Sequence, residues 1–182
     1  MPRLDKATRA KIKALESDAL REIVLKLASK DKSAFDFIMA NYVDPEKGAL
    51  QLFNEAKSDL RIIYYKDYKG FAPQMKLFNM LKAATKRVNE FTKVCNNKLF
   101  EANLLMDILY LVFHDFSEVS FGTAFTQLDN KVIIMLKRVI NVVKKFDEEQ
   151  REGYRTSINQ YLSVIHKKSS YLDATTKLPK EI

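Results

Sequence analysis

The run from Leu99 to Phe116, LFEANLLMDILYLVFHDF, is the most apolar part of this 182-residue chain. A helix that is apolar nearly all the way round is either buried in a protein core or spans a membrane. A membrane span needs about 20 consecutive, predominantly apolar residues. Here Glu101, Asp107, His114 and Asp115 interrupt the run, and its longest unbroken apolar piece is 108–113. We therefore predict a buried central helix rather than a membrane span.

Other helices are expected to cover this run, because the chain has few residues that make turns. Only four glycines and four prolines occur, whereas 47% of the residues are hydrophobic and 30% are charged, which is typical of a folded globular protein. No segment alternates polar and apolar residues over the length of a strand, so we predict no β-sheet. The predicted fold is all-α, with about seven mostly antiparallel helices in an irregular bundle or a short armadillo/HEAT-like superhelix.

Apolar spacing and capping residues locate the expected helices. Near the N-terminus, an apolar stripe predicts a helix over residues 18–29. The pair Asp44-Pro45 predicts a helix start, with a capping acid before a proline at the first helical position. After the central run, apolar residues keep one face from 121 to 146, which predicts one long helix, with a break near Asp129 as the alternative.

The length of the chain is that of a single domain. Helical periodicity holds as far as residue 168 and fails from Ser169 onward. We therefore predict one helical domain over residues 1–168, followed by a loosely ordered C-terminal tail over residues 169–182.

Charged residues are arranged in blocks that the net charge of +8 conceals. Residues 71–98 hold six bases and one acid, residues 99–130 hold five acids and no Lys or Arg, and residues 131–146 hold five bases and no acid. At about 100° per residue, the last five bases fall on one arc of a helix, opposite its apolar stripe. They are the predicted site for an anionic partner: Lys131, Lys137, Arg138, Lys144 and Lys145.

Two interpretations of these blocks stay open. A basic face can bind nucleic acid or another polyanion with salt-dependent, sequence-independent affinity. The aromatic residues of segment 64–71, beside Lys66 and Lys69, add the option of base stacking. Alternatively, the bases form a solvated helix face, or the acidic block that separates the basic blocks neutralises them in the fold.

Asp107, His114 and Glu118 stand at i, i+7 and i+11, so they project from one side of the central helix. Carboxylates and an imidazole can ligate a divalent metal or act as acid and base. These residues are candidates for a metal site. One helix seldom completes such a site, and the chain lacks the Glu-x-x-His motif of di-iron bundles, so the alternative is that His114 is a hydrogen-bonded core residue.

Motifs for cofactor chemistry do not occur in the sequence. It has no glycine-rich phosphate loop, no Cys-x-x-Cys pair and no nucleophile elbow, so we predict no cofactor and favour a protein without enzymatic activity. The single cysteine, Cys95, excludes an internal disulfide and fits a reducing compartment. No apolar stretch follows the basic N-terminal residues, so we expect no signal peptide, no membrane association and a cytoplasmic location.

The segment Ser17–Ala28, followed by Phe35–Ile38, resembles the start of small, uncharacterised, all-helical bacterial proteins with armadillo-like packing. The resemblance covers about 30 residues and consists mainly of leucines and charged residues. It implies an all-helical fold. It implies no activity, cofactor or site residue.

Three functional hypotheses follow from the sequence. The first is a non-enzymatic helical protein whose surface binds another macromolecule, in particular another protein. The second is a nucleic-acid-binding protein that uses its basic helix faces. The third is a metal-dependent enzyme centred on Asp107, His114 and Glu118.

Overall fold

The computed structural model describes residues 4–118, 121–169 and 172–182, and within these ranges it contains helices, turns and loops but no strand. The prediction of an all-α fold is confirmed, with 78% of the chain helical. In chain order the helices are α1 (Lys6–Lys13), α2 (Ser17–Lys30), α3 (Lys32–Ile38), the π-helical turn η1 (Met39–Val43), α4 (Pro45–Tyr65), α5 (Pro73–Val94), α6 (Lys98–His114), α7 (Thr126–Val143), α8 (Glu148–Lys168) and α9 (Leu172–Thr175).

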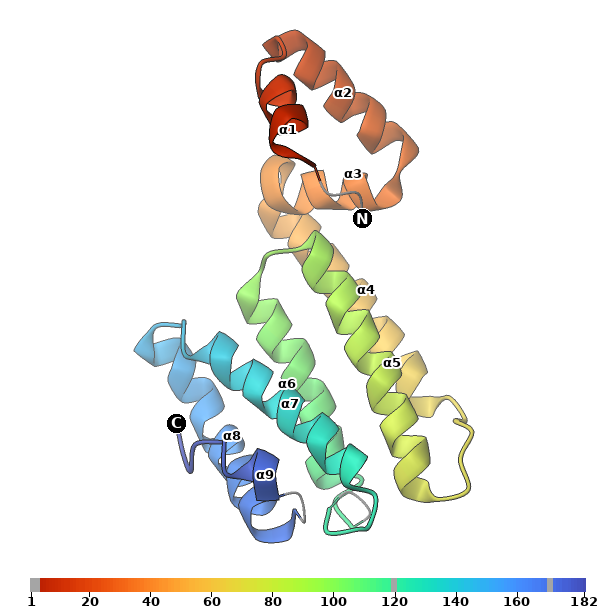
Figure 1. The fold of residues 1–182 in the computed structure, drawn as a ribbon, viewed down its shortest axis with the longest axis vertical. Coiled ribbons are helices and arrows are strands. Elements are labelled where there is room, and N and C mark those ends of the chain that lie inside the picture. The colour runs from red at the N-terminus through yellow and green to blue at the C-terminus, as the bar shows by residue number, and fades with distance from the viewer. Residues whose placement is uncertain (1–3, 119–120, 170–171) are drawn as a thin grey trace.

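Helices α4 to α8 run alternately down and up, so that successive helices are antiparallel (Figure 1). Helix α5 packs on α4, α6 and α7, and α8 packs on α7. Helices α1 and α2 lie apart from this bundle, beyond the end at which α4 begins, whereas α3 contacts α5 (Figure 1). Within the described ranges, none of the helices combines the length and apolar character that crossing a lipid bilayer requires.

Helix α6 is the predicted central helix, and the structure confirms its place in the core. Asn97 caps its start, where the side-chain oxygen accepts a hydrogen bond from the amide of Phe100 at 3.0 Å. Eight of its 17 residues are buried, and Leu104, Leu105 and Ile108 are completely enclosed. Burying each such side chain contributes about 1.5–3 kcal/mol to folding, so α6 supplies much of the apolar contact that holds the bundle together.

The start of α4 also agrees with the sequence. The Asp44 carboxylate accepts a hydrogen bond from the amide of Lys47, and Pro45 occupies the first turn. At the start of α8, Asp147 caps in the same way and accepts from the amide of Gln150 at 2.8 Å. These acids satisfy amides that have no partner inside the helix and interact favourably with the positive end of its dipole.

The expectation of one long helix over residues 121–146 is wrong, because α7 begins only at Thr126. Phe121 is buried, but it reaches the core from the preceding loop. Gly122 has a φ of +76°, a left-handed conformation that a right-handed helix excludes. The helix is continuous across Asp129, which is buried in its first turn.

The C-terminal residues pack on α7 and α8. Ser169 donates a hydrogen bond from its hydroxyl to the buried Asp129 carboxylate at 2.6 Å. Leu178 is buried, and the amide of Ile182 donates to the side chain of Asn159 at 2.9 Å. The division of the chain into a domain over 1–168 and a tail over 169–182 stays a prediction.

Candidate functional site

Residues 4–43, which contain α1, α2, α3 and η1, form the part of the chain that we call the N-terminal arm. Local capping explains the starts of two of its helices. Asp5 accepts a hydrogen bond from the amide of Thr8 at 2.6 Å and starts α1. Asp31 accepts from the amide of Ser33 at 2.8 Å and starts α3 directly after α2. Helix α2 begins after Glu16, whose side chain makes no capping hydrogen bond.

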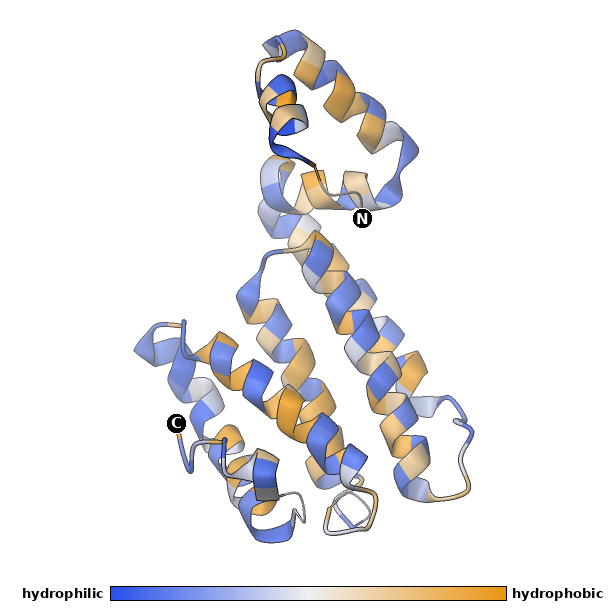
Figure 2. Cartoon of the chain, viewed as in Figure 1, coloured by the Kyte–Doolittle hydropathy of each residue, from blue (hydrophilic) through white to orange (hydrophobic). Residues whose placement is uncertain are grey.

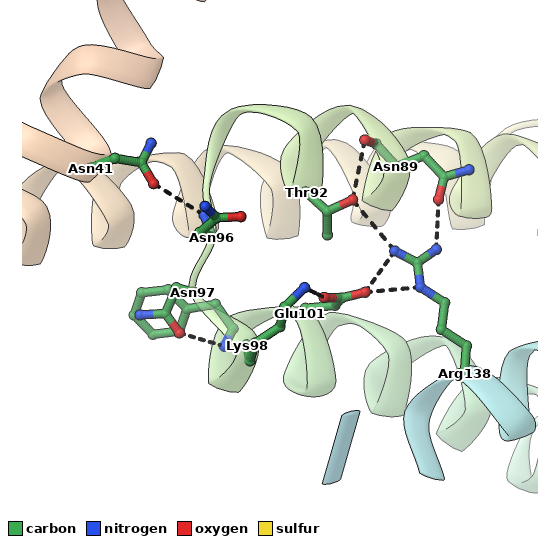
Figure 3. Close-up of polar contacts among 9 residues, drawn as sticks. Asn41, Asn89, Thr92, Asn96, Asn97, Lys98, Glu101 and Arg138 are labelled. Atoms are coloured by element: carbon green, nitrogen blue, oxygen red, sulfur yellow. Dashed lines mark hydrogen bonds and ion pairs between the residues drawn. The ribbon is translucent and has the colours of Figure 1, made fainter. Parts of the chain in front are cut away.

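The arm is attached to the bundle at η1. The Asn41 side-chain amide donates to the carbonyl of Val94 at 2.7 Å, and its oxygen accepts from the amide of Asn96 at 3.3 Å (Figure 3). Gly48 of α4 lies against η1 so closely that a Cβ atom there would come within 2.9 Å of the Ala40 Cα. This junction places the arm next to the end of α5 and the start of α6.

Beyond that junction the arm has no core of its own. None of the residues of α1, α2 or α3 is buried. Leu25 is 70% exposed and Leu27 is 54% exposed, and both belong to α2, which carries apolar and polar residues (Figure 2). The large apolar side chains that the arm exposes are Leu4, Ile12, Leu15, Ile23, Val24, Leu25, Leu27, Phe35, Phe37, Tyr42 and Val43.

These eleven exposed side chains all belong to one segment of 40 residues, whereas proteins that act alone rarely expose large apolar patches. The sequence predicted the helix over 18–29 but gave no indication that its apolar stripe would remain uncovered. An apolar stripe shows which side of a helix avoids water, and it does not identify what covers that side.

The structure separates the five predicted basic residues into groups with different surroundings. Lys131 and Arg138 are seven residues apart and follow one edge of α7, the edge at which Arg138 meets α5, and Lys145 lies in the turn after the helix. Lys137 and Lys144, also seven apart, lie roughly 100° further round the helix. Lys144 and Lys145 are exposed, whereas the other three are partly buried.

Arg138 is held by the interior rather than presented to solvent (Figure 3). Its guanidinium lies 2.7 Å from the carboxylate of Glu101 on α6, whose side chain is only 6% exposed. It also donates to the side chains of Asn89, at 2.5 Å, and Thr92, at 3.4 Å. Lys98 completes the cluster with an ammonium 2.8 Å from the second Glu101 oxygen. The acidic block therefore neutralises one of the five predicted bases.

These contacts also set the ionisation of Glu101. Burial alone would raise the pKa of this carboxyl, but hydrogen bonds and positive charge from Lys98 and Arg138 outweigh burial and lower it. The carboxylate is thus kept charged inside the fold. Glu101 on α6 binds Arg138 on α7, and Arg138 also binds Asn89 on α5, so this cluster holds the three helices together and has a structural role.

Lys131 has a different environment, beside other cations. Burial lowers the pKa of its ammonium group, and the positive charges of Lys82 and Arg138 lower it further. Lys82 belongs to α5, so the two basic blocks of the sequence meet where α5 and α7 pack together. Among the described residues, no ion pair joins Lys82 or Lys131 to a carboxylate.

The candidate metal residues are not brought together. Asp107 pairs with Lys57 of α4, with 3.4 Å between the ammonium and the carboxylate. His114 is exposed at the end of α6, and its ring stacks on Tyr110 with centroids 4.2 Å apart. Glu118 is exposed in the following turn. Across the described parts of the chain, no group of three or more His, Cys, Asp or Glu residues is arranged to hold a metal ion.

No family model, curated protein or solved structure matches this chain.

Proposed function

We propose that this chain is a helical interaction protein whose N-terminal arm docks on an apolar surface of a partner protein. The observation that carries the proposal is the absence of any buried residue in α1, α2 and α3, together with the exposed apolar side chains of the arm. A partner would supply the core that these helices lack. The bundle, built around α6, would serve as the rigid base from which the arm extends.

The energetics favour docking through apolar contact. Short helices are marginal in water by themselves, and most of their stability in proteins comes from burial of an apolar face. Fully burying a Leu, Ile or Phe side chain is worth about 1.5–3 kcal/mol. Leu25 and Leu27 are 70% and 54% exposed, so more than half of the surface of each remains for a partner to bury, and Phe37, which is 38% exposed, leaves a smaller share.

Charge favours a protein partner for the arm over a polyanion. Residues 4–43 carry eight bases and six acids, so the arm is close to neutral. Some of these charges pair locally, as Arg21 does with Asp18 at 2.8 Å. A surface of this kind offers little to a phosphate backbone, which binds through excess positive charge.

Photo-crosslinking in the full-length chain tests this function. A benzophenone amino acid at Leu25 or Phe37 should give one discrete crosslinked partner in the cells that make the protein, and Leu27→Asp should abolish that product. Ile134 is the matched control position, because it is 54% exposed but belongs to α7 of the bundle.

Two results would contradict the proposal. One is the absence of a discrete product from both arm positions. The other is the same product from Ile134, unaffected by Leu27→Asp. A product that contains two copies of this chain would support the proposal and identify the partner as the chain itself.

A second candidate function, polyanion binding, is favoured by the position of Lys131. Its ammonium lies beside Lys82 and Arg138, and placing like charges together is unfavourable unless an anion neutralises them. A phosphate backbone that crosses the α5–α7 contact would do so. Arg138 is a poor choice for testing this idea, since changing it would also break its pairing with Glu101.

Duplex binding at increasing salt tests the second candidate. If it holds, the affinity of the full chain for a labelled duplex should fall steeply with salt, as expected for counterion release. Lys131→Gln and Lys82→Gln should each weaken binding, whereas Lys26→Gln on the exposed face of α2 should not. A flat salt response, or equal losses in all three variants, would exclude this function.

A further inference from the structure

A cleft of about 700 Å³ lies between α4 and α6, away from the arm and from the α5–α7 contact. Its volume is within the range of about 300–1,000 Å³ that small-molecule sites occupy. Six polar or aromatic side chains carry its chemistry: Lys57, Arg61, Tyr64, Tyr65, Asp107 and Tyr110. The cleft therefore combines aromatic rings with two positive charges and one negative charge, and the negative charge of Asp107 is paired with Lys57.

Helical spacing explains why these side chains meet. Lys57, Arg61 and Tyr64 stand at i, i+4 and i+7 on α4, so they share one face of that helix. Asp107 and Tyr110 stand three residues apart on α6, which packs against α4. The 3.4 Å ion pair between Lys57 and Asp107 joins the two walls.

The aromatic rings of the cleft are available to a ligand. Tyr65 is 91% exposed and Tyr110 is 56% exposed, which is unusual for such large side chains. One face of the Tyr110 ring is occupied by His114, stacked at 4.2 Å with an interplanar angle of 25°. A planar group placed on the Tyr110 ring would extend this stack.

Two polar groups of the cleft have no partner among the residues that the structure describes. Arg61 is exposed, and no carboxylate among the described residues forms an ion pair with it. The Tyr64 hydroxyl is buried and has no hydrogen-bond partner in the same part of the chain. Burial, and then the negative charge of Asp107, raises the pKa of Tyr64, so its hydroxyl remains a donor. An acceptor oxygen of a ligand would satisfy this buried group, whose isolation otherwise costs free energy.

We infer that the α4–α6 cleft binds a nucleotide, with the base stacked on Tyr110 or Tyr65 and the phosphate paired with Arg61. Stacking on a tyrosine ring stabilises a bound ligand most when the ligand is itself a flat aromatic ring, and every nucleobase presents such a ring. A guanidinium without a partner matches the geometry of a phosphate. The ligand would be either a free mononucleotide or one unit of a single strand, because both present the same base and phosphate.

Calorimetric titration of the full chain tests this site. The probes are AMP, adenosine, inorganic phosphate and a ten-residue single strand of dT. AMP or the strand should bind saturably, and adenosine and phosphate should each bind at least about ten-fold more weakly, because each lacks half of the contacts. A strand that binds more tightly than AMP would identify the single strand as the ligand.

Three variants locate the binding, and each should leave the bundle folded because the changed atoms are at the surface or on a hydroxyl. Tyr110→Leu and Arg61→Gln should each weaken the affinity by about ten-fold, and Tyr64→Phe by a smaller factor. Tyr42→Leu and Arg9→Gln, on exposed residues of the arm, are the matched controls and should have no effect. Circular dichroism checks that all five variants are folded.

Several outcomes would overturn the assignment. One is no saturable binding of AMP or of the strand. Another is that inorganic phosphate binds as tightly as AMP, which would mean that the rings of Tyr65 and Tyr110 contribute nothing to the affinity. A third is an equal loss in the control variants, which would place the ligand elsewhere. All of these are separable from the arm proposal, because the test does not involve Leu25, Leu27 or Phe37.

Discussion

Arg138 on α7 and Glu101 on α6 meet across the interior, with Nη2 of the arginine 2.7 Å from Oε1 of the glutamate. The glutamate side chain is 6% exposed and the arginine side chain 27% exposed, so the pair is largely withdrawn from water. Removing one member of such a pair leaves the other charge buried without compensation.

Arg138→Ala should therefore lower the free energy of unfolding by about 2–3 kcal/mol, a little under the cost of breaking a fully buried pair because the arginine is partly exposed. Arg138→Lys should recover only part of this loss, since lysine cannot reproduce the forked contacts to Glu101 and Asn89. Urea denaturation measures both effects. The control Lys137→Ala should change stability by no more than about 0.5 kcal/mol, and a loss as large as that of Arg138→Ala would contradict a specific role for the pair.

The lowered pKa of Glu101 predicts a pH dependence. Because the folded-state pKa lies below the ordinary value of 4.5, the unfolded chain binds the proton more readily. The stabilisation is therefore complete above about pH 4.5 and is lost as the pH falls through the folded-state pKa. The stability gap between the natural chain and Glu101→Gln should shrink over that interval. A difference in the free energy of unfolding that stays constant or widens in acid would contradict this prediction.

Two glycines should respond to alanine in opposite directions. Gly122 has a φ of +76°, and an added Cβ would lie 2.9 Å from the carbonyl oxygen of Lys168, so Gly122→Ala should destabilise by about 1–2 kcal/mol. Gly153 lies within α8, and its added Cβ would meet nothing within 4 Å. Gly153→Ala should stabilise by about 0.5–1 kcal/mol. Thermal unfolding of both variants compares them directly, and a shift of the same sign in both would contradict the loop geometry.

Cys95 should be unreactive in the folded protein. The thiol is 2% exposed, and burial raises its pKa, although the amide of Asn97 opposes this shift. Because the thiolate is the reacting species, the folded chain should react with a disulfide reagent far more slowly than the chain unfolded in urea. Reaction of the native protein at the rate of a free cysteine would show that the end of α5 opens readily.

Features set by neighbouring residues were predictable from the sequence. The cap Asp44 acts within one helical turn, so its residue type, followed by Pro45, indicated the start of α4 directly. The central position of α6 was predictable because its sequence is apolar on nearly every side. The start of α7 was mispredicted because the apolar pattern extends back to Phe121, whereas the left-handed conformation of Gly122 excludes a helix at that position and α7 begins only at Thr126.

Features that depend on packing were not predictable. The charge blocks drew attention to Arg138. Its partner Glu101 is 37 residues away in sequence, so their pairing depends on how α6 and α7 pack together. The α4–α6 cleft joins Tyr65 to Tyr110, and only the aromatic segment 64–71 was evident beforehand. The uncovered arm was missed for the same reason, because an apolar stripe is identical whether or not a neighbour covers it.

Hydrogen exchange of the full-length chain, alone and with the partner identified by crosslinking, tests the central claim most directly. In the free chain, the amides of α2 should exchange much faster than those of α6, because α2 has no buried residue and α6 is the core. The bound partner should slow the hydrogen exchange of the α2 amides by at least about ten-fold and leave the exchange of the α6 amides unchanged. If α2 is as protected as α6 in the free chain, or if the partner leaves α2 unaffected, the arm is not the docking surface.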